Sequence, residues 1–313
     1  MRNGNVGPHI TAFLAVMCFY TLSFAQVSDT VPRHPFWQKA PAYNPVRGRL
    51  VGFTALGGYT LGMSALYSAW YRDYPSSKFH LFYDGKEWLQ MDKIGHAGSS
   101  YYISRWSSSL VEWTGLPSKK ASLLGTGFAT AFMITIEMFD GFSSEWGFSP
   151  GDIIANTTGA GVFLGQELLW QEQRVSFKFS YTEDPLVNKR PSIFGSSFIE
   201  HSLKDYNGQT YWLSFNLSSF MKQAGIPPWL NIAAGYGAGN MLTAKEGVVV
   251  DGISDPGKRF RQFYLSPDIE WSKIPVKSGA LKTLFKVIGF IKFPAPSLEY
   301  RSNGSWVFHG LHF

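Results

Sequence analysis

The sequence predicts an α+β protein, in which an N-terminal bundle of about four apolar helices precedes an antiparallel, aromatic-rich β-sheet or a small partial or complete barrel. Two observations predict this class. In residues 47–173, long apolar segments alternate with short breaks of Gly, Pro and Ser, as in an antiparallel helical bundle. From residue 174 onward, apolar and polar residues alternate with the two-residue period of a half-buried strand. The chain therefore divides into a helical region and a β region.

The helical region contains four apolar segments that are expected to form the bundle, over residues 47–75, 90–113, 118–139 and 150–172. The first of these segments is long enough to span a bilayer. Its many glycines and alanines also suit close contact between helices. Because only short breaks separate the segments, each helix is expected to run antiparallel to the next.

The β region, 174–313, contains six or seven segments of about nine residues in which aromatic and aliphatic side chains share one face. Outer-membrane barrels use strands of this length and alternation. A half-buried antiparallel sheet packed on the helices has the same pattern. The sequence leaves both architectures open, although six or seven strands are fewer than the smallest bacterial barrel needs. An apolar, helix-like insertion near 279–291 interrupts the series.

The composition points toward a membrane or an interface. Hydrophobic residues make up 45% of the chain and aromatic residues 17%, whereas charged residues make up only 16%. Soluble domains usually contain about 25% charged residues. The formal charge of +6 is spread along the chain without a basic run, which argues against a nucleic-acid partner.

The N-terminus has the pattern of a secretory signal peptide over residues 1–25. A positive charge at Arg2 precedes an apolar stretch, and small residues stand at the two positions that a signal peptidase reads before residue 26. The alternative is an uncleaved N-terminal helix. Residues 26–46 are rich in proline and have no period, so we expect an extended arm.

Cys18 is the single cysteine and lies inside the expected signal peptide. A mature chain without it would have no disulfide, no thiolate metal site and no cysteine nucleophile. Met17 precedes Cys18 where lipid attachment needs a small residue, so we do not expect lipidation at this position.

Three of the expected helices each carry a polar pair at helical spacing. The pairs are Asp92 with His96, Glu137 with Asp140, and Asp152 with Asn156. Residues three or four positions apart lie on one face of a helix, so the pairs could converge on a shared polar site. A histidine among carboxylates serves either as an acid or base, or as a ligand of a divalent metal. We predict no other cofactor, and the metal ligands would be His96, Glu137 and Asp152.

Each of these residues also has a purely structural interpretation. Asp152 follows an N-cap sequence and favours the helix dipole, so a capping role is the stronger interpretation of this residue alone. Asp140 could shape a turn, and Asp92 could be an acid that favours the start of a helix. His96 could equally be a satisfied core histidine. Glu137 is different, because it lies beside the apolar run "TAFMITI" and a buried acid there needs a partner.

Several long segments resemble a known family. "WLQMDKIGHAGSSYYISRW", "EMFDGFSSEWGFSPGDIIANTTGA" and "QELLWQEQRVSFKFS" are similar to an uncharacterised envelope family typified by the predicted periplasmic lipoprotein YfiM. The resemblance is closest to the longer form found in Bacteroidetes bacteria and extends over nearly the whole mature chain. It implies a place in the cell envelope and no particular reaction.

The helical half also resembles VanZ-like membrane proteins. The matching positions are Asp92, Lys93, His96, Glu137, Asp152, Asn156 and Gly159. This likeness implies that the polar pairs form one set across three helices. The chain departs from these relatives in its strand-rich tail and in lacking a lipidation cysteine, which weighs against a lipid-anchored or simple inner-membrane placement.

Together these observations predict a membrane-associated protein of the cell envelope that serves a structural, assembly or lipid-organising role. Its expected partners are membrane lipid and other envelope proteins. Its expected location is the outer membrane or a periplasm-facing surface, with the inner membrane as the alternative. The alternative function is a membrane-associated enzyme that acts on a lipid or glycan headgroup through His96 and the acids. A channel or transporter would need a polar lumen, of which the sequence shows little sign.

Overall fold

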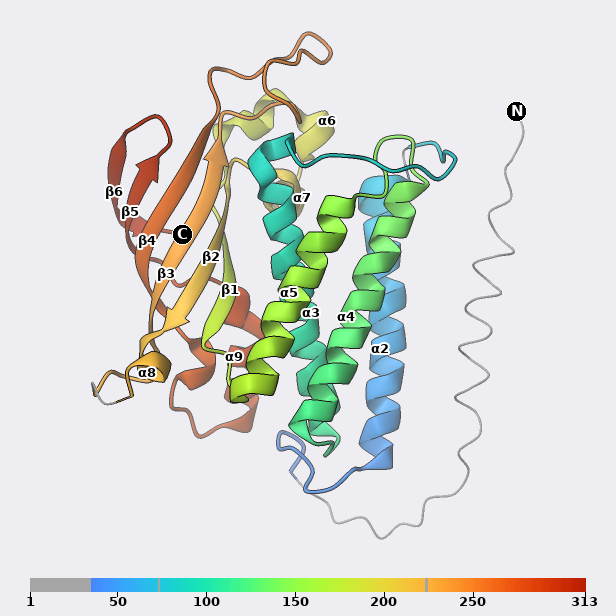
Figure 1. The fold of residues 1–313 in the computed structure, drawn as a ribbon, viewed down its shortest axis with the longest axis vertical. Coiled ribbons are helices and arrows are strands. Elements are labelled where there is room, and N and C mark those ends of the chain that lie inside the picture. The colour runs from blue at the N-terminus through green and yellow to red at the C-terminus, as the bar shows by residue number, and fades with distance from the viewer. Residues whose placement is uncertain (1–34, 73, 223–224) are drawn as a thin grey trace. The chain divides into compact units, whose positions relative to one another are not determined.

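The computed structural model describes residues 35–72, 74–222 and 225–313. The expected signal peptide, Cys18 and most of the expected arm lie outside these residues. Within the compact unit Phe36–Phe313, helices come first and one six-stranded antiparallel sheet follows (Figure 1). This arrangement confirms the predicted α+β class.

Four long helices form the bundle: α2 (Pro45–Leu66), α3 (Met91–Trp113), α4 (Ser118–Gly141) and α5 (Pro150–Trp170). Local signals set two of the helix starts. The Asn44 side chain accepts hydrogen bonds from the first backbone N–H groups of α2, and Ser149 caps α5 in the same way. A proline follows each cap at the first helical position, where its missing N–H costs nothing.

Small residues let α3 pack closely against its two neighbours. A Cβ added at Gly159 of α5 would lie only 1.9 Å from the carbonyl oxygen of Ala97 in α3. A Cβ added at Gly125 of α4 would lie 2.2 Å from Ser108 Oγ, also in α3. These two contacts fix α4 and α5 against α3 at a distance that only glycine permits, and so they position the polar residues that the three helices carry.

Among the described residues, α4 is the one helix that is long and apolar enough to cross a membrane, judged by length and composition alone. The segment 47–75, which was expected to be long enough to span, forms α2 and a π-helical turn at Tyr67–Tyr71, and neither meets this measure. A single such helix is weak evidence of a membrane crossing, because core helices of globular proteins have the same properties.

The sheet is a meander in which each strand pairs with the next along the chain. Its strands are β1 (Val175–Tyr181), β2 (Gln209–Asn216), β3 (Leu230–Gly239), β4 (Phe260–Ile269), β5 (Ala295–Arg301) and β6 (Trp306–His312). No ladder joins β1 to β6 in the described chain. Instead, Lys292 N donates a hydrogen bond to Phe179 O at the free edge of β1, and Thr182 Oγ1 contacts Phe313 O nearby. The β region is therefore a curled sheet whose edges approach without closing a barrel ladder.

The two faces of this sheet have reversed polarity. One face carries buried polar and charged side chains, among them Ser176, Lys178, Ser214, Asp268 and Glu299. On the opposite face, paired residues across five strands form an exposed apolar row, which we call the outer row: Leu213, Ala234, Leu265, Leu298 and Phe308. The side chain of Phe308 is 71% exposed and that of Leu265 is 52% exposed. Folding in water alone would favour the opposite distribution.

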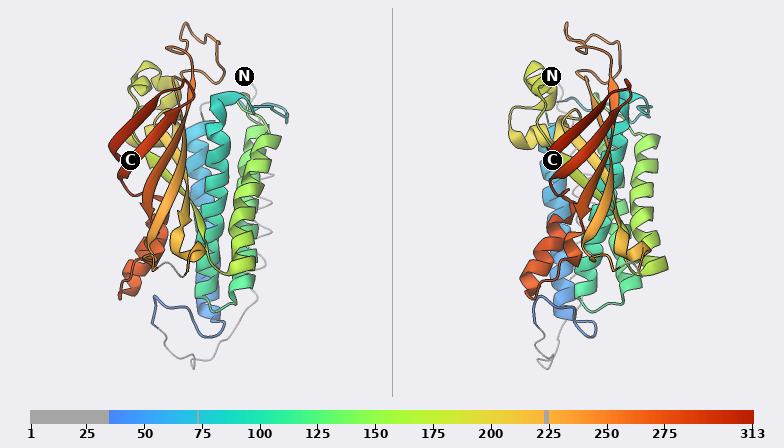
Figure 2. Two further views of the ribbon diagram at one scale, coloured as in Figure 1. Left: turned by 60° about the vertical axis from the view of Figure 1, so that its left-hand side comes forward. Right: turned by 90° about the vertical axis from the view of Figure 1, so that its left-hand side faces the viewer.

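The helices and the sheet meet along α3, which contacts β1 and β2 (Figure 2). The Tyr102 hydroxyl donates to the carbonyl oxygens of Phe177 in β1 and Gly289, at 2.7 and 2.9 Å. Between the strands lie the short helices α6 (Pro191–Phe194), α7 (Phe198–Lys204), α8 (Leu217–Phe220) and α9 (Gly279–Val287). Helix α3 is therefore the bundle helix that contacts the sheet.

Candidate functional site

The start of α3 is held by an unusual backbone. Trp88, Leu89 and Gln90 have φ values of 45°, 49° and 65°, a left-handed run of three residues that are not glycine. Such a conformation costs free energy and persists only where surrounding contacts impose it. Here the carbonyl oxygen of Leu89 accepts hydrogen bonds from the Tyr236 hydroxyl and the Arg261 guanidinium, at 2.5 and 3.0 Å. These contacts from the sheet fix where α3 begins.

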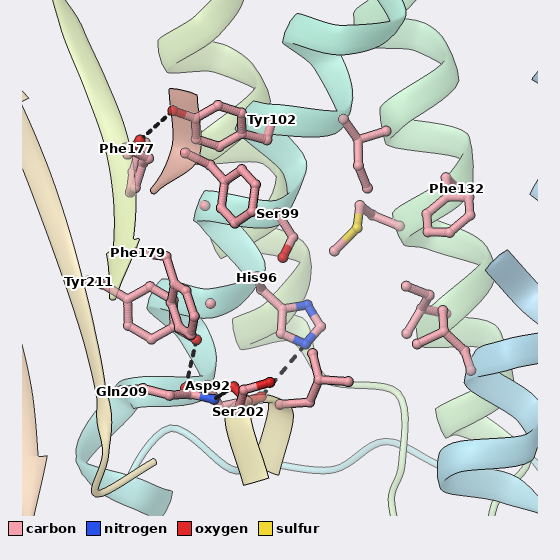
Figure 3. Close-up of a pocket in the computed structure, with 18 of the residues that line it drawn as sticks. Asp92, His96, Ser99, Tyr102, Phe132, Phe177, Phe179, Ser202, Gln209 and Tyr211 are labelled. Atoms are coloured by element: carbon pink, nitrogen blue, oxygen red, sulfur yellow. Dashed lines mark hydrogen bonds and ion pairs between the residues drawn. The ribbon is translucent and has the colours of Figure 1, made fainter. Parts of the chain in front are cut away.

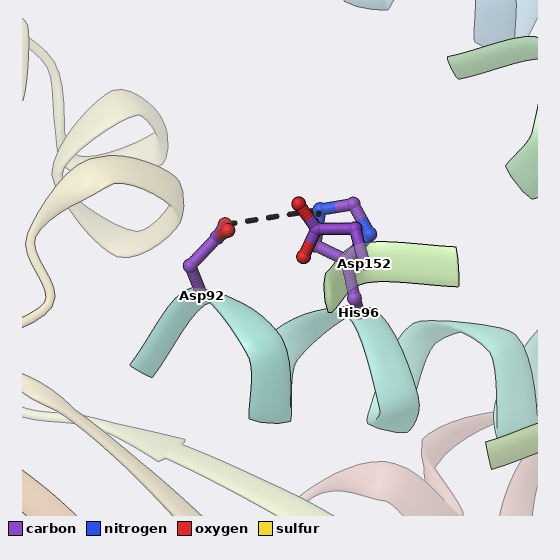
Figure 4. A group of neighbouring side chains, drawn as sticks. All are labelled: Asp92, His96 and Asp152. Carbon is purple, nitrogen blue, oxygen red and sulfur yellow. Dashed lines mark ion pairs between the residues drawn. The ribbon is translucent and has the colours of Figure 1, made fainter. Parts of the chain in front are cut away.

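The polar pairs of α3, α4 and α5 converge on the imidazole of His96. Its Nε2 atom lies 3.7 Å from Asp92 Oδ1 and 3.9 Å from Asp152 Oδ1 (Figure 4). Its Nδ1 atom lies 3.2 Å from Asn156 Oδ1 and 3.5 Å from Glu137 Oε1. The structure thus brings five of the six predicted site residues together. The five residues, which we call the His96 cluster, are Asp92, His96, Glu137, Asp152 and Asn156.

Asp140, the sixth predicted residue, contacts a different partner. Its Oδ1 atom accepts a hydrogen bond of 2.7 Å from the Tyr71 hydroxyl, beyond the end of α2.

The side chain of Asp152 does not cap α5, contrary to its interpretation as a capping acid. Ser149 Oγ caps the backbone N–H of Asp152, while the Ser149 N–H donates to Glu137 Oε2 at 3.3 Å. The cap therefore leaves the Asp152 carboxylate free to join the cluster.

Lys93 and Asp84 complete the cluster's surroundings. The Lys93 ammonium lies 2.5 Å from Asp84, 3.0 Å from Asp92 and 2.8 Å from Asp152. Tyr206, from the loop before β2, donates to Asp92 Oδ1 at 2.8 Å. Lys93 is one of the positions for which the sequence predicts a likeness to VanZ-like proteins, so its position was a usable signal. Asp84 and Tyr206 carried no signal, because only the fold brings them to the start of α3.

Glu137 Oε1 and Asn156 Nδ2 are buried and lack hydrogen-bond partners, whereas Asp152 Oδ1, which also makes no hydrogen bond, lies 2.8 Å from the Lys93 ammonium. The Glu137 side chain has no exposed surface. A buried polar atom without a partner carries its full desolvation cost, about 1–3 kcal/mol. The cluster is therefore able to accept a further polar group or a cation.

Burial and charge shift the pKa values of the cluster in opposing directions. Burial raises the pKa of Glu137 to about 8, although nearby His96 opposes the shift. Burial and repulsion from Asp92 raise the pKa of Asp152. For Asp92, burial is outweighed by attraction to His96 and Lys93, so its pKa is lowered. For His96, burial is outweighed by the surrounding carboxylates, so its pKa is raised. The cluster can thus hold or release protons near neutral pH.

The cluster borders a cavity of about 590 Å³ beside α3 (Figure 3). Most of its walls are apolar and come from α2, α3, α4 and β1, including Leu66, Ile103, Phe132, Ile136, Phe177 and Phe179. Asp92 and His96 lie toward one end of the view in Figure 3, and Tyr102 lies toward the other. Tyr206 and Gln209 add polar groups to the lining. The cavity is therefore an apolar pocket with a polar end.

The fold and the site define a helical-bundle protein in which a buried histidine–carboxylate cluster borders an apolar pocket and an antiparallel sheet is added after the bundle. Residues 81–165 match the family model described as predicted periplasmic lipoprotein (DUF2279). This confirms the resemblance to the periplasmic lipoprotein family over these residues. The likeness to the Bacteroidetes form and to VanZ-like proteins stays a prediction.

The matched segment contains every predicted site residue, whereas the sheet lies outside it. No curated protein and no solved structure gives a significant match to the chain. The family match supports association with the cell envelope and a periplasm-facing location, and it assigns no activity.

Proposed function

We propose that this chain is an envelope protein that binds an amphipathic membrane lipid in the pocket beside α3. The observation that carries the proposal is the pocket itself, whose apolar walls lead to a polar end at Asp92 and His96. Burying an acyl chain against such walls is favourable by about 25 cal/mol for each Å² removed from water. The polar end would receive the headgroup, because its charged and hydroxyl groups can replace the hydrogen bonds that the headgroup makes with water.

The reversed polarity of the sheet supports contact with a membrane. The outer row is exposed and apolar, whereas Lys178, Asp268 and Glu299 on the other face are buried. Large exposed apolar patches mark interaction or membrane surfaces. Strands with apolar side chains outward and polar side chains inward are typical of outer-membrane proteins, so we favour the outer membrane over the inner membrane.

Photo-crosslinking tests lipid binding in the pocket. The full chain would be placed in vesicles that contain a phospholipid with a photoreactive acyl chain, and crosslinked residues would be mapped by mass spectrometry. We expect crosslinks at Ile103 and Phe132, which line the pocket. Ile136→Trp should remove most of them by filling the pocket. Ile134→Trp, two positions away and 44% exposed, should not remove them.

Crosslinks confined to exposed residues, with none inside the pocket, would overturn the proposal. Equal pocket labelling in the Ile136→Trp and Ile134→Trp variants would overturn it as well, because a filled pocket cannot hold an acyl chain.

The His96 cluster favours a second candidate function, an enzyme that acts on a lipid or glycan headgroup. Its imidazole borders the pocket and is flanked by carboxylates, one of which has a pKa of about 8. A group that titrates near the working pH is suited to general acid–base catalysis. The test is incubation of the protein with total envelope lipid and glycan, followed by mass spectrometry. Products that the wild type forms and His96→Asn does not form would support this function, and identical product profiles would exclude it.

A further inference from the structure

We propose that Asp92, His96 and Asp152 bind one divalent transition-metal ion. One ligand atom from each of the three side chains lies within 4.8 Å of the others (Figure 4). The three residues come from the first turns of α3 and α5, which Gly159 holds in close contact. The inference concerns the metal alone and does not depend on lipid binding in the pocket.

The orientation of the imidazole favours metal binding through Nε2. The Nδ1 atom faces two acceptor oxygens, Asn156 Oδ1 at 3.2 Å and Glu137 Oε1 at 3.5 Å. Nδ1 therefore carries the proton, which leaves the lone pair of neutral His96 on Nε2. Histidine ligands of metals are commonly oriented in this way, with the other ring nitrogen donating to a carboxylate or an amide oxygen.

The spacing of the three ligand atoms also fits a metal. Asp92 Oδ1 and Asp152 Oδ1 lie 3.7 and 3.9 Å from His96 Nε2. These distances are too long for a charge-assisted hydrogen bond, which is about 2.7–2.9 Å. In a tetrahedral site with metal–ligand bonds of about 2.0–2.2 Å, neighbouring ligand atoms lie roughly 3.4 Å apart. The three ligand atoms lie within 4.8 Å of one another, so movement of the two carboxylates toward the imidazole would close the site.

Charge supplies an independent argument. Four buried or half-buried carboxylates surround the site, those of Asp84, Asp92, Glu137 and Asp152, and one ammonium, that of Lys93, contacts three of them. Glu137 Oε1 is fully buried, has no hydrogen bond and lies beside the imidazole. An uncompensated buried carboxylate is costly, so the cluster needs either protons or a further cation.

Lys93 contacts two of the proposed ligand residues, Asp92 and Asp152, so a metal would share both carboxylates with the ammonium. It contacts Asp92 through Oδ2, whereas Oδ1 of the same carboxylate faces His96. Asp92 can therefore bridge the ammonium and the metal with its two oxygens. Lys93 Nζ donates a hydrogen bond to Asp152 Oδ2 at 2.8 Å and lies at the same distance from Oδ1, the atom that faces His96.

The ligand set selects the kind of metal. One imidazole and two carboxylates suit Zn²⁺ or Mn²⁺, because Ca²⁺ and Mg²⁺ prefer all-oxygen sites and Cu⁺ prefers sulfur. Three protein ligands leave at least one coordination position open, as in catalytic zinc sites. Because Asp92 and His96 line the pocket, the open position would face the pocket.

The test is a metal titration of the full chain, purified without a polyhistidine tag and treated with a chelator. Co²⁺ serves as the spectroscopic probe and Zn²⁺ as the competitor. We expect one Co²⁺ per chain, with visible absorption bands that Zn²⁺ abolishes. Asp92→Asn, His96→Asn and Asp152→Asn should each weaken binding by about 10- to 100-fold. Asp140→Asn, which removes a nearby acid bonded to Tyr71, should leave the affinity unchanged.

Absence of the Co²⁺ bands in the wild type would overturn the inference, and so would equal affinities in the wild type and all three ligand variants. Thermal unfolding in chelator shows whether each variant is folded. A variant that fails to fold is left out of the comparison, and the wild-type spectrum and the remaining variants then decide.

Discussion

His96 Nδ1 on α3 lies 3.2 Å from Asn156 Oδ1 on α5, across 60 positions of the chain. This contact fixes the direction in which the imidazole points. The Nε2 atom is thereby turned toward Asp92 and Asp152, at the polar end of the pocket. A single contact between two helices thus links the packing of the bundle to the chemistry of the site.

The first prediction concerns the role of the His96 cluster. In a strain that lacks the native protein, His96→Asn and Glu137→Gln should fail to restore the phenotype although their abundance is normal. Glu137→Gln keeps the size of the side chain, and His96→Asn replaces the imidazole with a smaller amide. Both substitutions remove a group that titrates near neutral pH. The matched control is Glu145→Gln, which lies in the turn before α5 and outside the cluster. Full complementation by both cluster variants at normal abundance would show that the cluster is only structural.

The second prediction tests the close contact between α3 and α5. Gly159→Ala should lower the free energy of unfolding by about 1–3 kcal/mol, because its Cβ would meet the Ala97 carbonyl oxygen. Gly161→Ala, in the same helix with no other atom within 4 Å of an added Cβ, should stabilise the protein by up to about 1 kcal/mol. Denaturant unfolding of both variants measures the difference. Equal effects would mean that the two helices are farther apart in solution.

The third prediction is a pH dependence that arises between the bundle and the sheet. Glu270 is buried and lies 3.4 Å from Arg105 of α3. Although burial opposes ionisation, Arg105 and Lys178 lower the pKa of Glu270 below its ordinary value of 4.5. The folded state therefore binds this proton less readily than the unfolded state does. The stabilisation from Glu270 should be complete above pH 4.5 and should be lost as the pH falls through the lower folded-state pKa.

The variant Glu270→Gln measures this contribution. At pH 7 it should unfold more easily than the wild type by about 3–5 kcal/mol, because Arg105 loses its charged partner in a buried site. The difference should shrink below pH 4.5. A difference that stays constant between pH 7 and pH 3 would rule out titration of Glu270 as its cause.

The fourth prediction concerns the outer row. Phe308→Glu should reduce the fraction of protein that floats with lipid vesicles, since it places a charge on the surface proposed to contact lipid. The side chain is 71% exposed, so the fold should tolerate the change. Val249→Glu is the control, because Val249 is 65% exposed but lies in the loop between β3 and β4, outside the outer row. Equal flotation of the two variants would count against lipid contact at the outer row.

Much of the fold could be predicted because its signals are local. The expected helices at 118–139 and 150–172 correspond to α4 and α5 with small shifts at their ends, since caps and short breaks define them. The left-handed run Trp88–Gln90 could not be predicted, because contacts from the sheet impose it on residues that do not favour it. The short helices between β1 and β2 were also not expected.

The candidate site was predictable where residues repeat at helical spacing. Asp92 and His96 share a helix face, and their meeting with Asp152 follows once α3 and α5 pack together. The partner of Asp140 was not predictable, because Tyr71 reaches it only after α2 has packed against α4. The reversed polarity of the sheet could not be predicted from the sequence either, because alternation along a strand does not show which of its two faces is covered.

The central claim is that the pocket beside α3 holds a membrane lipid, and an experimental structure of the full chain extracted from its native membrane tests it most directly. We predict elongated, acyl-chain-like density along Ile103, Phe132 and Ile136, with its polar end at His96. A pocket that contains only ordered water, or that is closed by the protein's own side chains, would contradict the account.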